Sequence, residues 1–126
     1  MAPFLFLFVV GRDHDTAEGT CIRDYVHVAD LADAHWRALT YLLEGGTTTA
    51  FNLSNGMGFS VAEVIATAAR VTQRRIPVVD APRRAGDPAR LVADARRAQT
   101  VLGWQPRYTD LASLIAHAWA WECRAG

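Results

Sequence analysis

The chain has 126 residues, which is long enough for one compact domain and short for two. Its thirteen basic and thirteen acidic residues cancel, so the overall charge points to neither a nucleic acid nor an anionic membrane surface. The basic residues are all Arg, since the sequence contains no Lys. The two cysteines lie far apart without a CxxC pair, which favours reduced thiols and a cytoplasmic protein.

The first part of the chain predicts two extended segments and a helix. An apolar run over residues 4–10 predicts a buried strand, and it is too short to span a bilayer. If a domain that normally packs on this run is missing, we expect its apolar side chains to be exposed. A polar loop over 12–20 leads to an extended segment at 22–28. Apolar residues at helical spacing then predict a helix that opens at Asp30 and stops at Gly45.

The middle of the chain predicts a strand, a helix and a second strand. Residues 50–54 read as a short buried strand that is followed by an NGMG turn. Ser60 and Glu63 form a capping-box pattern, so a helix is expected from about residue 61. A short strand is predicted over 76–80.

The last part predicts an ordered loop and two helices. Two prolines hold residues 81–91 in a loop that is expected to be neither helix nor ladder strand. Asp94 is expected to cap a helix that ends before Gly103, and Thr109 or Asp110 to cap the last helix. The fold class is therefore α/β, with short strands alternating with about four helices.

Three sequence features could bind an anion. Arg23 lies in an RDY segment, the NGMG turn precedes a helix, and the Arg-rich loop contains the Arg83–Arg84 pair followed by Gly86 and Asp87. A guanidinium can hold two phosphate oxygens and a carboxylate can accept ribose hydroxyls, so the Arg and Asp side chains suit a nucleotide clamp. The same residues also suit solvated turns with local ion pairs, and composition leaves both readings open.

Other motifs are less specific. The NGMG turn lacks the third glycine of a dinucleotide fingerprint and is better explained as a plain turn into a helix. The four histidines have no HExxH or paired spacing, so they are interpreted as structural or solvent-facing and no metal site is expected.

Four ordered segments carry a family resemblance: GTCIRDYVHVADLADAH, FNLSNGMGFSVAEVI, APRRAGDPARLVAD and LGWQPRYTDL. Together they resemble the UDP-glucose 4-epimerases of the extended short-chain dehydrogenase/reductase type, over residues 11–122. The resemblance implies that residues 1–126 form a single C-terminal sugar-nucleotide-binding domain. Most of the Rossmann core, including the N-terminal NAD-binding domain, would then be missing.

The resemblance also assigns site residues. Arg23 matches an Arg that contacts the uridine diphosphate, while Arg84 and Asp87 match a loop that closes over the same nucleotide. Leu91 matches a position whose bulk influences whether N-acetylated sugars fit. Val10 departs from the family, in which many relatives have a Phe near the uracil.

The family's catalytic groups have no match here. Its members transfer a hydride between C4 of the sugar and NAD, with a Tyr whose pKa is lowered by a Lys four residues later. This chain has no Lys and no GxxGxxG, so it is expected to bind a UDP-sugar and to be inactive alone. The full-length enzyme would be a homodimer that binds NAD. The alternatives are a non-catalytic sugar-nucleotide-binding or dimerisation module, and a fragment of a related NAD-dependent dehydratase or decarboxylase.

Overall fold

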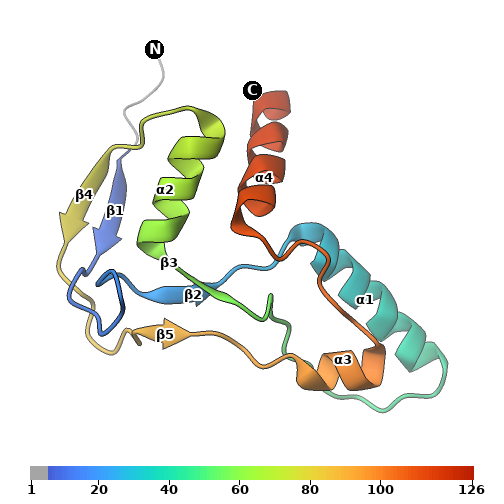
Figure 1. Cartoon of the computed structure of the whole chain (residues 1–126). Helices are drawn as coiled ribbons and strands as arrows, with labels where there is room; N and C mark the ends of the chain where they lie inside the picture. Colours follow the sequence, from blue (N-terminus) through green and yellow to red (C-terminus); the bar gives the residue numbers. More distant parts are fainter. Residues whose placement is uncertain (1–5) are drawn as a thin grey trace.

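The computed structural model describes residues 6–126 and has strands and helices in alternation (Figure 1). This confirms the predicted α/β class with four helices, none of which, within the described range, is long and apolar enough to cross a membrane. In chain order the elements are β1 (Leu7–Val10), β2 (Ile22–Asp24), α1 (Val28–Leu43), β3 (Gly58–Ser60), α2 (Val61–Thr72), β4 (Val78–Ala81), β5 (Arg90–Leu91), α3 (Arg96–Leu102) and α4 (Leu111–Ala125).

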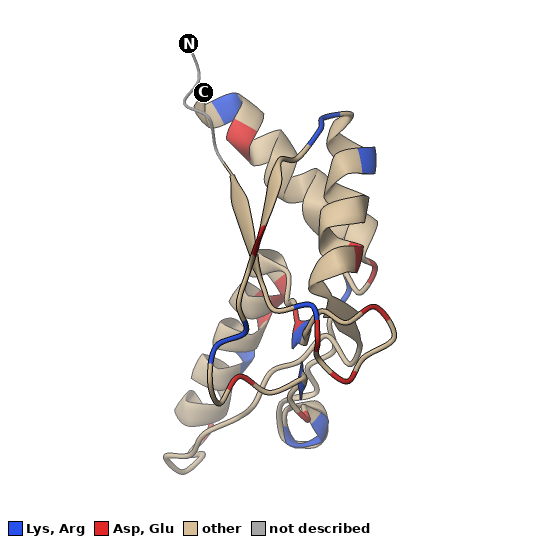
Figure 2. Ribbon diagram, turned by 90° about the vertical axis from the view of Figure 1, so that its left-hand side faces the viewer, with Lys and Arg blue, Asp and Glu red and all other residues tan. Residues whose placement is uncertain are grey.

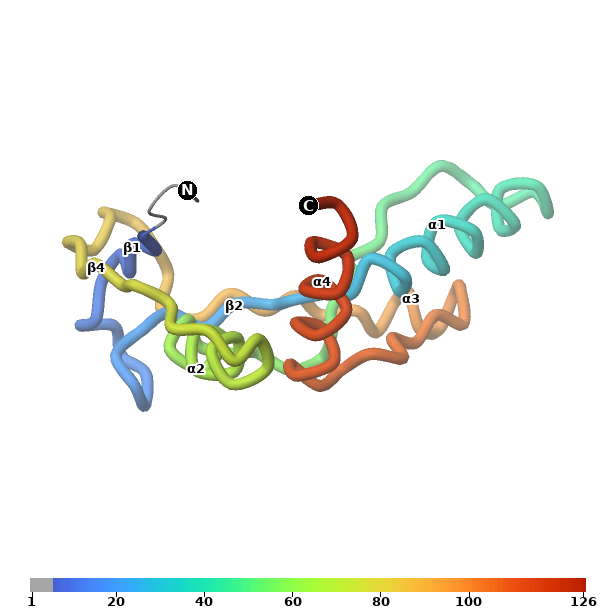
Figure 3. Tube along the Cα trace, turned by 90° about the horizontal axis from the view of Figure 1, so that it is seen from above, coloured from blue at the N-terminus to red at the C-terminus, as the bar shows by residue number. Residues whose placement is uncertain are grey.

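The strands form two small sheets. β1 and β4 form a parallel pair, with Leu7 opposite Val78. β2 is the centre of the other sheet, antiparallel to β3 and parallel to β5. Seen from above, the molecule is elongated, with the β1–β4 pair at one end, α1 and α3 at the other, and α2 and α4 between them (Figure 3).

The apolar N-terminal run forms a strand that is mostly uncovered. β1 begins at Leu7, and residues 4 and 5 of the predicted strand lie outside the described residues. Val9 is buried, but Phe6, Leu7 and Phe8 are exposed, so the expectation of a buried strand is wrong for these three. Strand β4 covers one edge of β1 and nothing in the described chain covers these side chains, which matches the expected exposure of apolar surface.

Local capping signals located the helix ends well. The Ser60 hydroxyl accepts the N–H of Glu63 and the Glu63 carboxylate accepts the N–H of Ser60, which confirms the capping box of α2. Gly103 ends α3 in the left-handed region with φ of 65°. Of the two proposed caps for α4, the structure uses Asp110.

Other predicted boundaries were wrong. Helix α1 begins at Val28, before Asp30, because the Nδ1 atom of His27 accepts the N–H of Ala29 and caps the helix. The predicted strand at 50–54 is irregular, although the segment packs its apolar side chains against the core. Its backbone continues into Asn55, whose N–H donates to a carboxylate rather than to a neighbouring strand.

The Arg-rich loop also differs from its prediction. Arg90 and Leu91 form strand β5 beside β2, although no ladder strand was expected in this loop. Pro88 does not prevent this pairing because it precedes the two paired residues, and the carbonyl of Ala89 accepts the N–H of Ile22. The N-cap of α3 is Ala95 rather than Asp94, although the Asp94 carboxylate does accept the N–H of Arg96.

The main core lies between α1 and α3. Trp104 is fully buried there, and its indole N–H donates to the carbonyl of Asp30 at 2.8 Å. The buried carboxylate of Asp30 accepts the backbone N–H groups of Arg107 and Tyr108. Asp30 therefore holds the chain between α3 and α4 against α1, while α4 packs on α2.

Candidate functional site

Arg23 on β2 fastens the Arg-rich loop to the central strand. Its Nη1 atom donates to the carbonyls of Ile22 and Pro88, at 2.8 and 2.9 Å. Its Nη2 atom donates to Oδ1 of Asp87 at 2.6 Å, and both side chains are largely buried. The loop is therefore held against β2 by a charged contact and a carbonyl contact from one side chain.

Arg84 stands on the other side of Asp87. Gly86, with φ of +77° in the left-handed region, lies in a turn in which the N–H of Asp87 donates to the carbonyl of Arg84. The Nη2 atom of Arg84 lies 3.7 Å from Oδ2 of Asp87, which is too long for a hydrogen bond. Since the Arg84 side chain is 74% exposed, its guanidinium remains accessible to a ligand.

The three side chains form a cation–carboxylate–cation cluster. A guanidinium carries five N–H donors, and the contacts of Arg23 within residues 6–126 use three of them. Donors of both Arg side chains therefore remain for an anion, next to a carboxylate that can accept hydroxyl groups. Figure 2 shows acidic and basic segments intermixed along the loops, which agrees with the balanced charge of the chain.

Leu91 lies one strand away from the cluster. It is the register partner of Arg23 across the parallel β2–β5 pair, and its side chain is exposed. The structure therefore brings Arg23, Arg84 and Asp87 into one cluster and places Leu91 beside it.

The local ion pair considered for the RDY segment does not form. Asp24 instead accepts the N–H of Asn55 at Oδ1 and the N–H of Ala93 at Oδ2, so it ties two loops to the end of β2. Asn55 in turn donates from its side chain to the carbonyls of Tyr25 and Thr109. The NGMG segment is thus a structural turn, as the sequence predicted, although it leads first into β3.

Tyr25 follows β2, and its hydroxyl is unsuited to act as a general base. Burial raises the pKa of its hydroxyl, and the nearby Cys21 raises it further, whereas Arg23 partly offsets both effects. The phenol therefore remains protonated near neutral pH.

Sequence reasoning missed one group of side chains at this site. His14 and Cys21 lie beside Asp87, although His14 was expected to be structural or solvent-facing and Cys21 to be an ordinary thiol. Their spacing along the chain matches no metal or catalytic motif, so only the fold brings them together.

Short strands alternating with four helices around this cluster define the C-terminal portion of an extended short-chain dehydrogenase/reductase. The chain belongs to the GDP-mannose 4,6 dehydratase family, whose model matches residues 8–117.

Relatives at higher identity carry another name. UDP-glucose 4-epimerase from Halalkalibacterium halodurans is 51% identical over 114 residues, which are 90% of this chain and 34% of that protein. A crystal structure of a UDP-glucose 4-epimerase superposes with a TM-score of 0.89 at 49% identity, over 94% of this chain and 36% of the other. That of the enzyme from Bifidobacterium longum, in complex with NAD+ and UDP, gives 0.83 at 36% identity, over 93% and 34%. The chain thus spans about a third of the length of the relatives it matches.

Proposed function

We propose that this chain is the UDP-sugar-binding portion of a UDP-glucose 4-epimerase, which interconverts UDP-glucose and UDP-galactose in galactose metabolism. The observation that carries the proposal is the accessible Arg84 guanidinium beside an Asp87 carboxylate that Arg23 fixes in place. Relatives that are about 50% identical to this chain are named UDP-glucose 4-epimerase, which supports this activity. The Bifidobacterium longum enzyme in complex with NAD+ and UDP supports a uridine nucleotide as ligand.

In this proposal each residue has a separate role. The Arg84 guanidinium binds phosphate oxygens of the nucleotide, and the Asp87 carboxylate accepts ribose hydroxyls. Arg23 uses three donors to position the loop and its remaining donors to bind the diphosphate. Leu91, beside Arg23, limits the space for a substituent on the sugar.

Among the described residues, the start of α2 does not fit NAD. Its first three N–H groups, which a pyrophosphate would need, already donate to the Cys21 carbonyl, the Thr20 hydroxyl and the Ser60 hydroxyl, and the Glu63 carboxylate there repels an anion. NAD supplies the hydride acceptor of the proposed full-length enzyme, and other residues of that enzyme would hold it. With no Tyr–Lys pair, the chain is expected to be inactive alone. A homodimer remains a prediction from the resemblance, and a cytoplasmic location remains a prediction from the two unpaired cysteines.

Binding of UDP-glucose to the 126-residue chain tests the clamp. We expect weak binding, because part of the sugar site would come from other residues of the enzyme, so an NMR titration is the suitable measurement. Amide signals of the loop around Gly86 and Asp87 should shift. Arg84→Ala should weaken binding about tenfold or more, the cost of losing a hydrogen bond to a charged group.

Arg124→Ala is the matched control, because it removes an exposed Arg in the last turn of α4, away from the cluster. Its dissociation constant should equal that of the wild type. Binding that is unchanged in Arg84→Ala, or that shifts signals only outside the loop, would contradict the clamp. Turnover of UDP-glucose by the chain with added NAD would contradict the inactivity.

The dehydratase alternative receives support from the description of the family model. The relatives at about half identity are epimerases, so the epimerase is the better supported function.

A further inference from the structure

His14 is a buried side chain whose hydrogen-bonding capacity is unused. It is 4% exposed, and neither ring nitrogen has a hydrogen-bond partner among the described residues. Buried polar atoms in folded proteins nearly always have a partner, so this imidazole requires an explanation. Its Nε2 atom lies close to Gly11, where an added Cβ would be 3.0 Å from it, and the ring is thus confined on that side.

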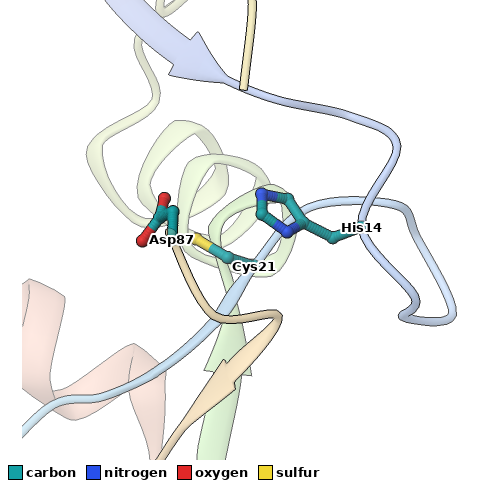
Figure 4. Close-up of side chains that lie close together, drawn as sticks. All are labelled: His14, Cys21 and Asp87. Carbon is teal, nitrogen blue, oxygen red and sulfur yellow. The ribbon is translucent and has the colours of Figure 1, made fainter. Parts of the chain in front are cut away.

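Two further ligand-type side chains lie beside this ring. The Sγ atom of Cys21, a carboxylate oxygen of Asp87 and a ring nitrogen of His14 all lie within 4.8 Å of one another. Figure 4 shows the three side chains close together, His14 from the loop after β1, Cys21 from the residue before β2 and Asp87 from the Arg-rich loop. An imidazole, a thiolate and a carboxylate are the three side-chain ligands that Zn²⁺ accepts.

We propose that His14, Cys21 and Asp87 form a binding site for a divalent transition-metal ion of the Zn²⁺ class, with water as the fourth ligand. Bonds of about 2.0–2.3 Å in a tetrahedron place neighbouring ligand atoms about 3.3–3.8 Å apart. Because the ligand atoms lie within 4.8 Å of one another, the separations need to contract by at most about 1.5 Å, which is within the range of side-chain rotation. On binding, the Cys21 thiol gives its proton to solvent and the thiolate coordinates the metal.

Hydrogen bonds already hold the three positions. The N–H of His14 donates to the carbonyl of Gly19, and the carbonyl of Cys21 accepts the N–H of Val61 at the start of α2. Asp87 receives its hydrogen bond from Arg23 at Oδ1. A carboxylate that binds a metal is usually oriented by a hydrogen bond from a residue outside the ligand set. In this site, Arg23 orients the Asp87 carboxylate in that way. The site shares Asp87 with the proposed nucleotide clamp, and its test uses the metal without a nucleotide, so failure of one proposal is distinguishable from failure of the other.

Titration of the reduced 126-residue chain with Co²⁺ tests the proposal, because cobalt bound to a thiolate absorbs in the near ultraviolet. We expect this absorption to saturate at one equivalent of Co²⁺ and to disappear when Zn²⁺ is added. Cys21→Ser should abolish the absorption. His14→Gln should raise the dissociation constant at least about tenfold.

Cys123→Ser is the matched control, because it removes the other free cysteine, which is exposed near the end of α4. It should keep the wild-type absorption and stoichiometry. Circular dichroism of each variant checks that the fold is retained, and His14→Gln provides the test if Cys21→Ser does not fold. No saturation near one equivalent in the wild type, or absorption that depends on Cys123 and not on Cys21, would overturn the proposal.

Discussion

The contact between Arg23 and Asp87 should contribute measurably to stability, and a double-mutant cycle measures it. The Nη2–Oδ1 distance is 2.6 Å, and the side chains are only 22% and 14% exposed. A hydrogen bond to a charged group at this burial contributes about 1.5–3 kcal/mol. We therefore expect a coupling free energy of about that size between Arg23→Ala and Asp87→Ala, from urea unfolding followed by circular dichroism.

The pair Arg96–Asp94 is the matched control. Its N–O distance is also 2.6 Å, but its side chains are 86% and 57% exposed, so solvent screening should leave no measurable coupling. Arg84 is close enough to form an ion pair with Asp87 when Arg23 is removed. The cycle is therefore repeated in a background in which every variant also carries Arg84→Ala. A coupling below about 0.5 kcal/mol in both backgrounds would refute the conclusion that Arg23 fixes the loop.

Two further predictions concern the α1–α4 region. Asp30→Ala should lower the free energy of unfolding by about 2–4 kcal/mol, because it leaves the N–H groups of Arg107 and Tyr108 without their acceptor, and urea unfolding measures this. Hydrogen bonds from the side chain and backbone of Ser113 hold the pKa of Asp110 below its usual value. The stability that this cap provides is complete above the pKa that Asp110 has in the unfolded chain, and it is lost as the pH falls through the lowered pKa of the folded state. Asp110→Asn should therefore make the temperature of thermal unfolding less dependent on pH in the acid range.

A control variant is available for Asp30→Ala, and a contradicting result can be stated for both Asp30→Ala and Asp110→Asn. Asp33→Ala, on the same helix, removes only a surface ion pair with Arg37 and should cost less than about 0.5 kcal/mol. An Asp30→Ala effect as small as this would contradict the role of the buried carboxylate. If the unfolding temperature falls with acid to the same extent in Asp110→Asn and in the wild type, the Asp110 carboxylate does not contribute to the pH dependence of stability.

Local signals predicted the helices because the interactions that end a helix are made by residues near in sequence. The Ser60–Glu63 capping box and Gly103 were identified correctly, and Asp110 was one of the two caps considered for α4. The strand predicted at 50–54 was wrong because apolar residues show only that a segment packs. A strand also needs a partner in register, and in the two described sheets no strand pairs with residues 50–54.

The same distinction applies to the candidate site. The sequence by itself singled out Arg23, Arg84 and Asp87 as candidates for a nucleotide clamp, because the ordered motifs resemble those of a family and guanidinium and carboxylate groups have defined chemistry. Only the tertiary structure decided that Arg23 pairs with Asp87 rather than with its neighbour Asp24. It also decided that His14 and Cys21 meet Asp87, because this contact depends on where the β1–β2 loop and the Arg-rich loop pass each other in space, and no local pattern encodes that crossing.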